Sequence, residues 1–400
     1  MLIITYVVAI SSNFLYNQKM KKQNFGFEKD MYWRKTQKRT NKKKSIVIVV
    51  AIIAAISVFL IYLFFFSGFK ISKATLLDLE MDVPENVSGT NDGFVFLDDN
   101  DLCYYDFKGE EIWKLSVDGT LSNLQTSKNA VCLYNDKIIQ LFSYDKRQLF
   151  ATSIDDNIEK VYCGDNAVAV LTIKTNQDGM ESSNIDTYDL DGKLVGRIEL
   201  KNMKILDFGI YGTSDTLWVL SLETTGVIPV SYIATYKLDS TTTGSIKMNT
   251  QIVERTFITD DSIIVSGTST VVSNTYFGEK KADALIYGWT PRDFAVQGTN
   301  VFILYETRET ALRNEGVSAV KLLNSDLSNM VIYFPEGAID AFVVPSGIWA
   351  FAKNNIYSYT ISGQTSKTIA SEDPIEGAKK INNSWAIVWS NSTSYLLKLA

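Results

Sequence analysis

A short apolar run that follows a turn-forming residue recurs eight times along the chain, at intervals of 36 to 49 residues. Each run is rich in β-branched and aromatic residues and is bounded by Gly, Asn, Asp or Ser, which is typical of strands rather than helices. A second, alternating run follows each first run, and most second runs end in Asp, Asn or Gly. The eight first runs begin at Gly93, Asn129, Asn166, Asp215, Asp261, Asn300, Gly347 and Ser384.

This repeat predicts the fold class. Four short antiparallel strands per unit of about 40 residues is the composition of a β-propeller blade. We therefore predict an all-β fold, a β-propeller of about eight four-stranded blades. Seven blades is the alternative, because the fifth unit is irregular and its second run falls as late as 282–289. The eighth copy lacks an outer strand, which residues 71–82 could supply, so that the two chain ends close the ring and leave no exposed sheet edge.

Residues 45–66 form an apolar segment without a charged residue. A helix of this length, rising about 1.5 Å per residue, matches the roughly 30 Å hydrocarbon core of a bilayer. The alternative is a cleaved signal peptide, whose apolar region is shorter, about 7–15 residues. A basic stretch ending in Lys42, Lys43 and Lys44 precedes the segment, and only two lysines follow it closely. The positive-inside rule therefore predicts one transmembrane helix with the N-terminus in the cytoplasm.

These features predict the domain organisation. Residues 1–44 carry 11 Lys and Arg against 2 Asp and Glu, so we expect this tail to contact anionic lipids of the inner leaflet. The apolar residues at the N-terminus are too few to span a bilayer, which favours a translation start at Met20 or Met31. The predicted parts are a cytoplasmic tail at 1–44, the transmembrane helix at 45–66, a linker at 67–73 and an extracytoplasmic propeller at 74–400. The predicted location is a bacterial cytoplasmic membrane.

Composition excludes several functions. Residues 45–400 carry 28 Lys and Arg against 43 Asp and Glu, and this acidic balance argues against nucleic acid as a partner. The chain has no histidine, which excludes a Ser-His-Asp triad, a Cys-His pair and the usual zinc sites. Cys103, Cys132 and Cys163 lie in or beside predicted strands, so we expect buried free thiols rather than a disulfide framework.

The first repeat resembles a known family. In "YDFKGEEIW" (105–113), Asp106, Gly109 and Trp113 match the repeat of the quinoprotein, or pyrroloquinoline-quinone-type, propeller superfamily. In "YDLDGKLVGRI" (188–198), Asp189 and Gly192 are kept but the Trp is absent. Over roughly residues 30–400, the chain is similar to a family of single-pass, membrane-anchored bacterial β-propeller proteins that are divergent relatives of this superfamily.

The resemblance implies a quinone cofactor only for the enzymes of the superfamily, which have a vicinal disulfide, a calcium site and a catalytic Asp. This chain has no adjacent cysteines, which argues against bound quinone. Its better comparison is the non-catalytic scaffold propellers of envelope assembly. We therefore predict no catalytic residue, no cofactor and no metal site, and we interpret Asp106, Gly109, Trp113, Asp189 and Gly192 as structural residues of the repeat.

Two kinds of candidate site remain. Asp155-Asp156 and Asp260-Asp261 suggest paired carboxylates for glycosidic cleavage, but neighbours on a strand point apart, so such a pair would have to be assembled between blades. Trp289 leaves a predicted strand into a Pro-containing loop, which makes it a candidate exposed contact for a partner. Polar insertions at 174–184, 268–281 and 307–316 are candidate binding loops, because loops on a rigid scaffold often carry function.

The sequence thus favours a non-catalytic, membrane-anchored scaffold that binds a membrane-proximal protein or a cell-wall polymer. The first alternative is a carbohydrate-active enzyme that uses carboxylates from different blades. The second is a sensor that signals to a cytoplasmic partner. An enzyme should place two carboxylates about 5–10 Å apart in one concave pocket. A scaffold should show apolar or aromatic residues on one face of the ring.

Overall fold

The structure is a computed structural model that describes residues 76–79, 86–117, 119–175, 181–201, 203–211, 215–248, 251–313, 316–391 and 393–399. The predicted tail with Lys42, Lys43 and Lys44, the predicted transmembrane helix and the predicted linker lie outside these residues. Within the described part of the chain, no helix is long and apolar enough to cross a membrane.

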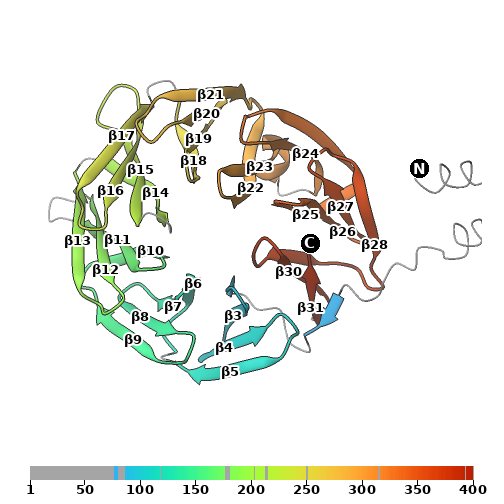
Figure 1. The fold of residues 1–400 in the computed structure, drawn as a ribbon, viewed down its shortest axis with the longest axis horizontal. Coiled ribbons are helices and arrows are strands. Elements are labelled where there is room, and N and C mark those ends of the chain that lie inside the picture. Colours follow the sequence, from blue (N-terminus) through green and yellow to red (C-terminus); the bar gives the residue numbers. More distant parts are fainter. Residues whose placement is uncertain are drawn as a thin grey trace, which may run out of the picture. The chain divides into compact units, whose positions relative to one another are not determined.

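The described residues contain 31 strands and one six-residue helix, α3 (Arg308–Arg313). The strands form six four-stranded sheets and one seven-stranded sheet, all antiparallel, and the sheets lie in a ring with their first strands nearest the centre (Figure 1). The seven-stranded sheet consists of two four-stranded sets that share β25 (Asn329–Val344), because residues 329–333 pair with one set and residues 338–344 with the next. The prediction of a β-propeller is confirmed, and the strand pairing divides into eight blades.

Blades 1 to 4 follow the order of the sequence. Blade 1 comprises β2 (Val87–Gly89), β3 (Gly93–Asp98), β4 (Asp101–Asp106) and β5 (Glu111–Ser116). Blade 2 comprises β6 (Asn123–Thr126), β7 (Ala130–Tyr134), β8 (Ile138–Ser143) and β9 (Gln148–Ser153). Blade 3 comprises β10 (Asn157–Cys163), β11 (Ala167–Thr175), β12 (Glu181–Asp189) and β13 (Leu194–Leu200). Blade 4 comprises β14 (Met203–Tyr211), β15 (Thr216–Glu223), β16 (Val230–Lys237) and β17 (Thr242–Met248).

Blades 5 to 8 complete the ring. Blade 5 comprises β18 (Val253–Ile258), β19 (Ile263–Gly267), β20 (Thr270–Asn274) and β21 (Lys280–Leu285). Blade 6 comprises β22 (Trp289–Gln297), β23 (Asn300–Thr307), β24 (Val317–Leu323) and the first part of β25. Blade 7 comprises the second part of β25, β26 (Gly347–Ala352), β27 (Asn355–Thr360) and β28 (Thr365–Ala370). Blade 8 comprises β29 (Gly377–Lys380), β30 (Trp385–Ser390), β31 (Thr393–Lys398) and β1 (Leu76–Asp78).

The two ends of the described chain close the ring. Strand β1 pairs antiparallel with β31, with Leu76 opposite Leu397 and Asp78 opposite Tyr395. The outer strand of blade 8 therefore comes from residues that precede blade 1, as expected from the missing strand of the eighth repeat. This arrangement leaves blade 8 with the same number of strands as its neighbours.

Blade 5 corrects one sequence-based expectation. The third strand of this blade is β20, which lies inside the segment 268–281 that the sequence predicts to be a polar insertion. The run at 282–289, which the sequence predicts to be the second run of this repeat, begins in the fourth strand, β21. The pattern was misleading because β20 is short and buries two polar side chains, Ser273 and Asn274, so its apolar signal is weak. The insertion at 307–316 contains α3.

Glycine begins the second strand in two blades because no side chain fits there. A Cβ atom at Gly93 would lie 1.9 Å from the carbonyl oxygen of Tyr105, and one at Gly347 would lie 2.0 Å from that of Tyr359. Both glycines start a repeat in the sequence, so the close approach of the third strand explains the residue type at that position.

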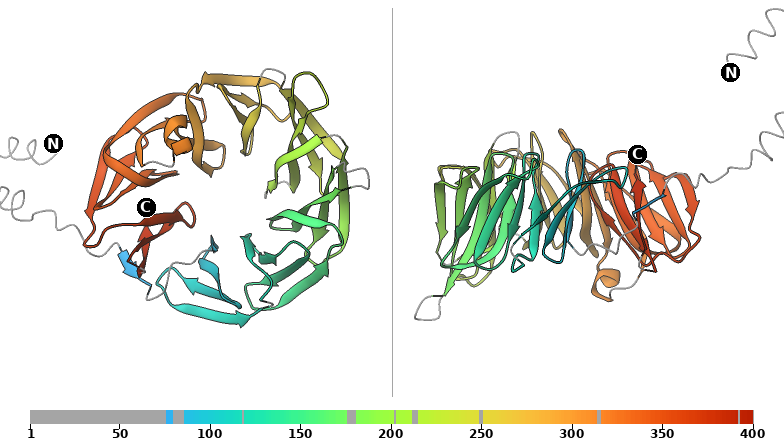
Figure 2. Two further views of the ribbon diagram at one scale, coloured as in Figure 1. Left: turned by 180° about the vertical axis from the view of Figure 1, so that it is seen from behind. Right: turned by 90° about the horizontal axis from the view of Figure 1, so that it is seen from below.

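The antiparallel order assigns every loop to one of two faces. In each blade, the turn between the second and third strands lies at the same end as the connection to the next blade, and the other two turns lie at the opposite end. Helix α3 connects the second and third strands of blade 6 and projects from one side of the ring (Figure 2). We call that side the α3 face.

Candidate functional site

The predicted repeat residues of blade 1 form a tight turn and a contact between blades. The Asp106 carboxylate accepts hydrogen bonds from the backbone N–H groups of Lys108 (2.8 Å) and Glu110 (3.0 Å). Gly109 has a φ of 82°, which glycine adopts at low cost. The buried Trp113 donates its indole N–H to the carbonyl oxygen of Tyr144 in blade 2, at 2.8 Å. These residues therefore shape the turn between β4 and β5 and hold two blades together.

The same turn recurs in blade 3. The Asp189 carboxylate accepts hydrogen bonds from the backbone N–H groups of Asp191 (3.1 Å) and Lys193 (2.8 Å), and Gly192 has a φ of 81°. Both hydrogen bonds end on the same carboxylate oxygen, Oδ1. The geometry is that of a hairpin in which an Asp caps the backbone two and four residues later.

Trp289 is the first residue of β22 and is partly buried. Its ring packs against the apolar cluster between blades 5 and 6, and the Lys321 ammonium lies 4.9 Å from the ring centroid. Burial lowers the pKa of Lys321. The aromatic residue that projects from this segment is Tyr287, with 84% of its surface exposed. A partner contact by Trp289 stays a prediction.

The three cysteines are free and buried, which confirms the expected state of these thiols. Burial raises the pKa of Cys103 to about 11 and that of Cys163 to about 12, and it raises the pKa of Cys132 well above its usual value. Since the thiolate is the reactive form, none of these groups is suited to nucleophilic catalysis.

We expect native protein to resist alkylation by iodoacetamide at pH 8, because the thiols are both inaccessible and protonated. The three thiols should react at least about tenfold more slowly than in urea-unfolded protein, where the thiol pKa returns to its usual range near 8.5. Intact mass measured over time counts the alkylated thiols. Rapid modification of one cysteine in native protein would mean that its blade opens locally.

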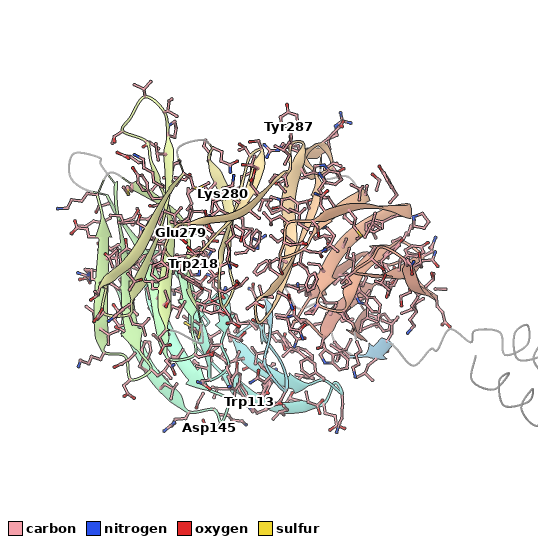
Figure 3. The ribbon with its side chains drawn as sticks, turned by 45° about the horizontal axis from the view of Figure 1, so that its top comes forward. Trp113, Asp145, Trp218, Glu279, Lys280 and Tyr287 are labelled. Carbon is pink, nitrogen blue, oxygen red and sulfur yellow. The ribbon has the colours of Figure 1, made fainter. Side chains whose placement is uncertain are left out.

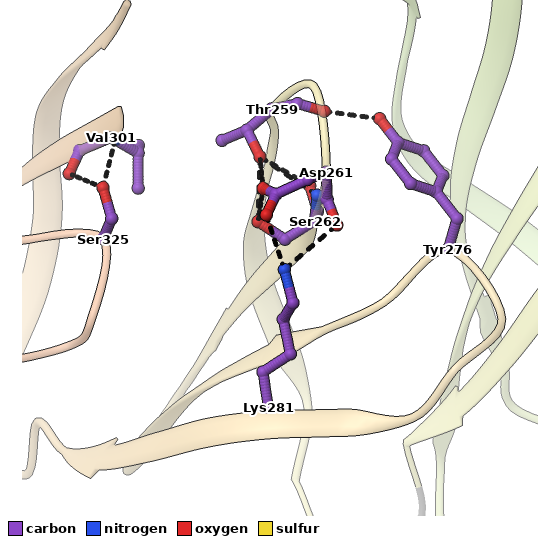
Figure 4. A network of polar contacts seen from close by, with 7 residues as sticks. All are labelled: Thr259, Asp261, Ser262, Tyr276, Lys281, Val301 and Ser325. Carbon is purple, nitrogen blue, oxygen red and sulfur yellow. Dashed lines mark hydrogen bonds and ion pairs between the residues drawn. The ribbon is translucent and has the colours of Figure 1, made fainter. Parts of the chain in front are cut away.

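The adjacent carboxylates Asp260 and Asp261 each accept hydrogen bonds from other side chains. Asp261 accepts hydrogen bonds from the Lys281 ammonium (2.7 Å) and the Thr259 hydroxyl (3.2 Å), as Figure 4 shows. Lys281 holds the pKa of Asp261 below its usual range. Asp260 accepts a hydrogen bond from the Tyr211 hydroxyl of blade 4. Both side chains therefore hold a turn between β18 and β19 on the face opposite the α3 face.

The inner strands of five successive blades share a β-bulge. The pairing of the first with the second strand shifts by one residue in blades 3 to 7, and the extra residues are Glu159, Leu206, Glu254, Arg292 and Ile339. The residues directly after the bulges are Lys160, Asp207, Arg255, Asp293 and Asp340. Bulges change the direction of side chains and are common beside functional sites. Here they coincide with charged residues on the strands nearest the ring centre.

Two open cavities lie along these bulges. Cavity A has a volume of about 390 Å³ and is lined by Lys160, Leu206, Asp207, Glu254, Arg255, Thr290 and Pro291. Cavity B has a volume of about 370 Å³ and is lined by Pro291, Arg292, Asp293, Glu306, Asp340, Ala341, Phe342 and Lys380. Pro291 lines both, so the cavities are neighbours. Most of their walls come from inner strands of different blades, which meet only in the folded ring.

Cavity B contains a partly buried ion cluster. Arg292 donates to the carboxylates of Glu306 (2.6 Å) and Asp340, and Lys380 donates to the carboxylate of Asp293 at 2.8 Å. The Lys380 ammonium also donates to two backbone carbonyl groups, in blades 6 and 7. The cluster therefore connects the inner strands of blades 6, 7 and 8.

Burial sets the protonation behaviour of this cluster. It raises the pKa of Asp340, although the Arg292 guanidinium acts in the opposite direction. It lowers the pKa of Lys380, although Asp293 acts in the opposite direction. No group of three or more His, Cys, Asp or Glu side chains in the described part of the chain is arranged to hold a metal ion. The three carboxylates of cavity B are instead paired with cations.

The α3 face carries exposed apolar residues on three neighbouring blades. They lie in the β15–β16 loop, before β18, at the end of β21 and after it, and on α3. Tyr287 and Leu312 are 84% and 82% exposed, and Figure 3 shows Tyr287 projecting from the ring. We call this set the apolar face residues: Val227, Ile228, Ile252, Leu285, Tyr287 and Leu312.

Sequence reasoning missed the charged residues of both cavities and most apolar face residues. One signal could have found part of the charged set. Asp207, Arg255, Asp293 and Asp340 each precede a phenylalanine by one or two positions, in four of the first strands. A charged residue that recurs next to or near Phe in several repeats indicates a strand that carries both charged and core-forming side chains.

A ring of eight antiparallel four-stranded sheets, closed by its two ends, defines a β-propeller. A family of unknown function, DUF5711, matches residues 86–177, which cover blades 1 and 2 and the start of blade 3. No curated protein matches the sequence.

Solved structures with a similar fold include both BamB and WD40 propellers. BamB from Moraxella catarrhalis is 9% identical, with a TM-score of 0.53 over 82% of this chain and 99% of that chain. The C-terminal WD40 domain of Sif2 is 10% identical, with a TM-score of 0.56 over 82% and 99%. The WD40 domain of SCAP from fission yeast is 10% identical, with a TM-score of 0.53 over 81% and 96%. At such identities, these similarities establish the β-propeller fold alone.

Proposed function

We propose that this protein is a non-catalytic scaffold that binds another protein on the α3 face of its propeller. The observation that carries the proposal is the set of apolar face residues, which are exposed on one face of blades 4, 5 and 6. Large exposed apolar side chains gathered on one face of a folded domain are typical of interaction surfaces. The opposite face has fewer such residues among the described ones, with Phe277 as the most exposed.

The chemistry of these residues favours a protein over a cell-wall polymer. Five of the six are aliphatic and none is charged, so they can bury area against an apolar protein segment. Binding to a glycan would use aromatic rings for stacking, and Tyr287 is the one aromatic residue in the set. In this proposal the predicted helix at 45–66 holds the ring at a bacterial cytoplasmic membrane, the basic tail contacts anionic lipids, and the partner is membrane-proximal.

The test compares capture of a partner by three full-length proteins: the wild type, a triple variant and a double variant that serves as the control. The triple variant replaces Leu285, Tyr287 and Leu312 with serine, and the control replaces Phe277 and Ile361, on the opposite face, with serine. We expect a stoichiometric membrane or envelope protein to bind the wild type and the control but to bind the triple variant at least about tenfold more weakly. Equal binding to both variants would contradict the proposal, as would recovery of no protein.

Cavity B provides the specific observation that favours a second candidate, a carbohydrate-active enzyme. Asp293, Glu306 and Asp340 line one concave pocket, and the raised pKa of Asp340 is a property of general acids. Against this function, all three carboxylates are ion-paired with Arg292 or Lys380. If the protein shortens cell-wall glycans over time and Asp340→Asn abolishes this activity, the proposed function is that of a carbohydrate-active enzyme and not that of a scaffold.

A further inference from the structure

Arg255 differs from the other charged residues of the two cavities. It follows the bulged residue Glu254 in β18 and lines cavity A. The carboxylates of this cavity have other partners. Asp207 pairs with Lys160 at 2.6 Å, and Glu254 pairs with Arg308 at 2.6 Å. Among the described residues, Arg255 has no carboxylate at ion-pair distance, so it is the one charged residue lining cavity A that forms no ion pair.

Aromatic rings hold this guanidinium in place. It lies 5.2 Å from the ring centroid of Phe294 in blade 6 and 5.9 Å from that of Phe257 in its own strand. Stacking on aromatic rings uses the faces of the planar guanidinium and leaves the N–H donors at its edge. A guanidinium fixed in this way loses little conformational entropy when it binds a carboxylate through two parallel hydrogen bonds.

A second cation, the Lys380 ammonium, contacts the backbone of Phe294. Its hydrogen bond to the Phe294 carbonyl is 2.7 Å long. Burial is the main cause of the lowered pKa of Lys380, and the positive charge of Arg255 acts in the same direction. The two like charges therefore repel each other. An anion at Arg255 would reduce this repulsion.

The charge of cavity A selects the kind of anion. Asp207 and Glu254 remain close to Arg255 even though each has a cation, so the cavity is suited to one negative charge rather than two. A carboxylate carries one charge and matches the fork of the guanidinium, whereas a phosphate close to neutral pH carries more charge. The volume of about 390 Å³ leaves room for a side chain as well as its carboxylate.

We propose that Arg255 binds a carboxylate group of the partner protein, which enters cavity A from the α3 face. The identity of the partner rests on the proposed function, but carboxylate binding by Arg255 does not. The residues that line cavity A lie in the first half or at the middle of the inner strands, which begin at the α3 face, so the apolar face residues and Arg255 can contact one ligand. The carboxylate comes from an acidic side chain or from the C-terminus of the partner.

The test follows the side-chain Nε–H signals of ¹⁵N-arginine-labelled full-length protein by NMR, at constant ionic strength. The probes are N-acetyl-aspartate α-amide, which carries a side-chain carboxylate, N-acetyl-alanine, which carries a C-terminal carboxylate, and inorganic phosphate. Arg255→Lys assigns the Arg255 signal by its disappearance. We expect the Arg255 signal to shift saturably with at least one carboxylate probe, while the signals of the ion-paired Arg292 and Arg308 stay within about a tenth of that shift. The tighter of the two carboxylate probes identifies the source of the group.

Three results would overturn the inference: no shift of the Arg255 signal, a shift that grows linearly along with those of exposed arginines, or tighter binding of phosphate than of both carboxylates. This outcome is independent of the scaffold test. If the serine variant of the apolar face residues loses its partner while Arg255 binds no carboxylate probe, the scaffold proposal is supported and the inference about Arg255 is wrong. If Arg255 binds a carboxylate probe while no partner depends on the apolar face residues, the inference about Arg255 is supported and the scaffold proposal is wrong.

Discussion

Replacing Arg292 with leucine is expected to lower the free energy of unfolding by about 3–5 kcal/mol, the usual cost of removing one partner from a buried ion pair. Arg292 serves two carboxylates, Glu306 and Asp340, and all three side chains are largely buried. Without the guanidinium, both carboxylates would remain at the junction of blades 6 and 7 with their main cation gone. The midpoint of urea unfolding, followed by tryptophan fluorescence, measures the loss.

The matched control is Arg313→Leu, which makes the same substitution in an exposed pair with Glu309 on α3 and should change the midpoint little. Adding Glu306→Gln and Asp340→Asn to the Arg292→Leu variant should restore part of the stability, because the unpaired charges are then removed. If Arg292→Leu and Arg313→Leu behave alike, the ion cluster does not stabilise the ring.

The loss in Arg292→Leu should also depend on pH. Burial already raises the pKa of Asp340 in the native protein, and removal of Arg292 would raise it further. When the pKa of a carboxyl is higher in the folded than in the unfolded state, the folded state binds the proton more tightly, so stability is greatest below the unfolded pKa and falls as the pH rises through the folded pKa. The difference between variant and wild type should therefore shrink as the pH is lowered toward the unfolded value near 3.8.

Replacing Leu79 with alanine is expected to lower the free energy of unfolding by about 2–5 kcal/mol, the range for a buried leucine. Leu79 follows β1, its side chain is 5% exposed, and its backbone N–H donates to the carbonyl oxygen of Ser394 at 3.0 Å. The side chain packs in a cluster with Phe94 of blade 1 and Leu396 of blade 8. It therefore contributes to the closure between the last blade and the first.

Leu77→Ala is the control, because Leu77 lies in the same segment but is 39% exposed. We expect this variant to lose less than about 1 kcal/mol, in proportion to the smaller area that Leu77 buries. Urea midpoints of both variants decide the question. Equal losses would mean that the closure depends on the backbone pairing of β1 with β31 rather than on the packing of Leu79.

The sequence predicted most strands of the ring. All eight first runs of the repeat are the second strands of blades, from β3 at Gly93 to β30 at Trp385. These strands are buried on both sides, so their apolar runs are continuous and easy to find. The prediction failed in blade 5, where Ser273 and Asn274 are buried in β20 and the apolar signal is therefore weak.

The candidate site was much less predictable. The inner strands alternate and contain charged residues, so they resemble solvent-exposed strands in sequence although they line the ring centre. The sequence predicts Trp289 as the exposed aromatic residue, whereas Tyr287, two residues earlier, is the side chain that projects into solvent. Which residue of a short connection is exposed depends on the direction in which the next strand starts, and local sequence does not determine that direction.

The sequence by itself determined the β-propeller fold, because strand periodicity and burial are local properties that each repeat encodes separately. It also favoured eight blades over seven, buried free thiols, and pairing of the chain ends through the strand that the last repeat lacks. Only the tertiary structure decided which charges meet. Asp293 and Lys380 are 87 residues apart, and Lys160 and Asp207 are 47 apart. Their contacts, and the lack of a carboxylate partner for Arg255 among the described residues, follow from the bulges that turn these side chains and from closure of the ring, which brings inner strands of different blades together.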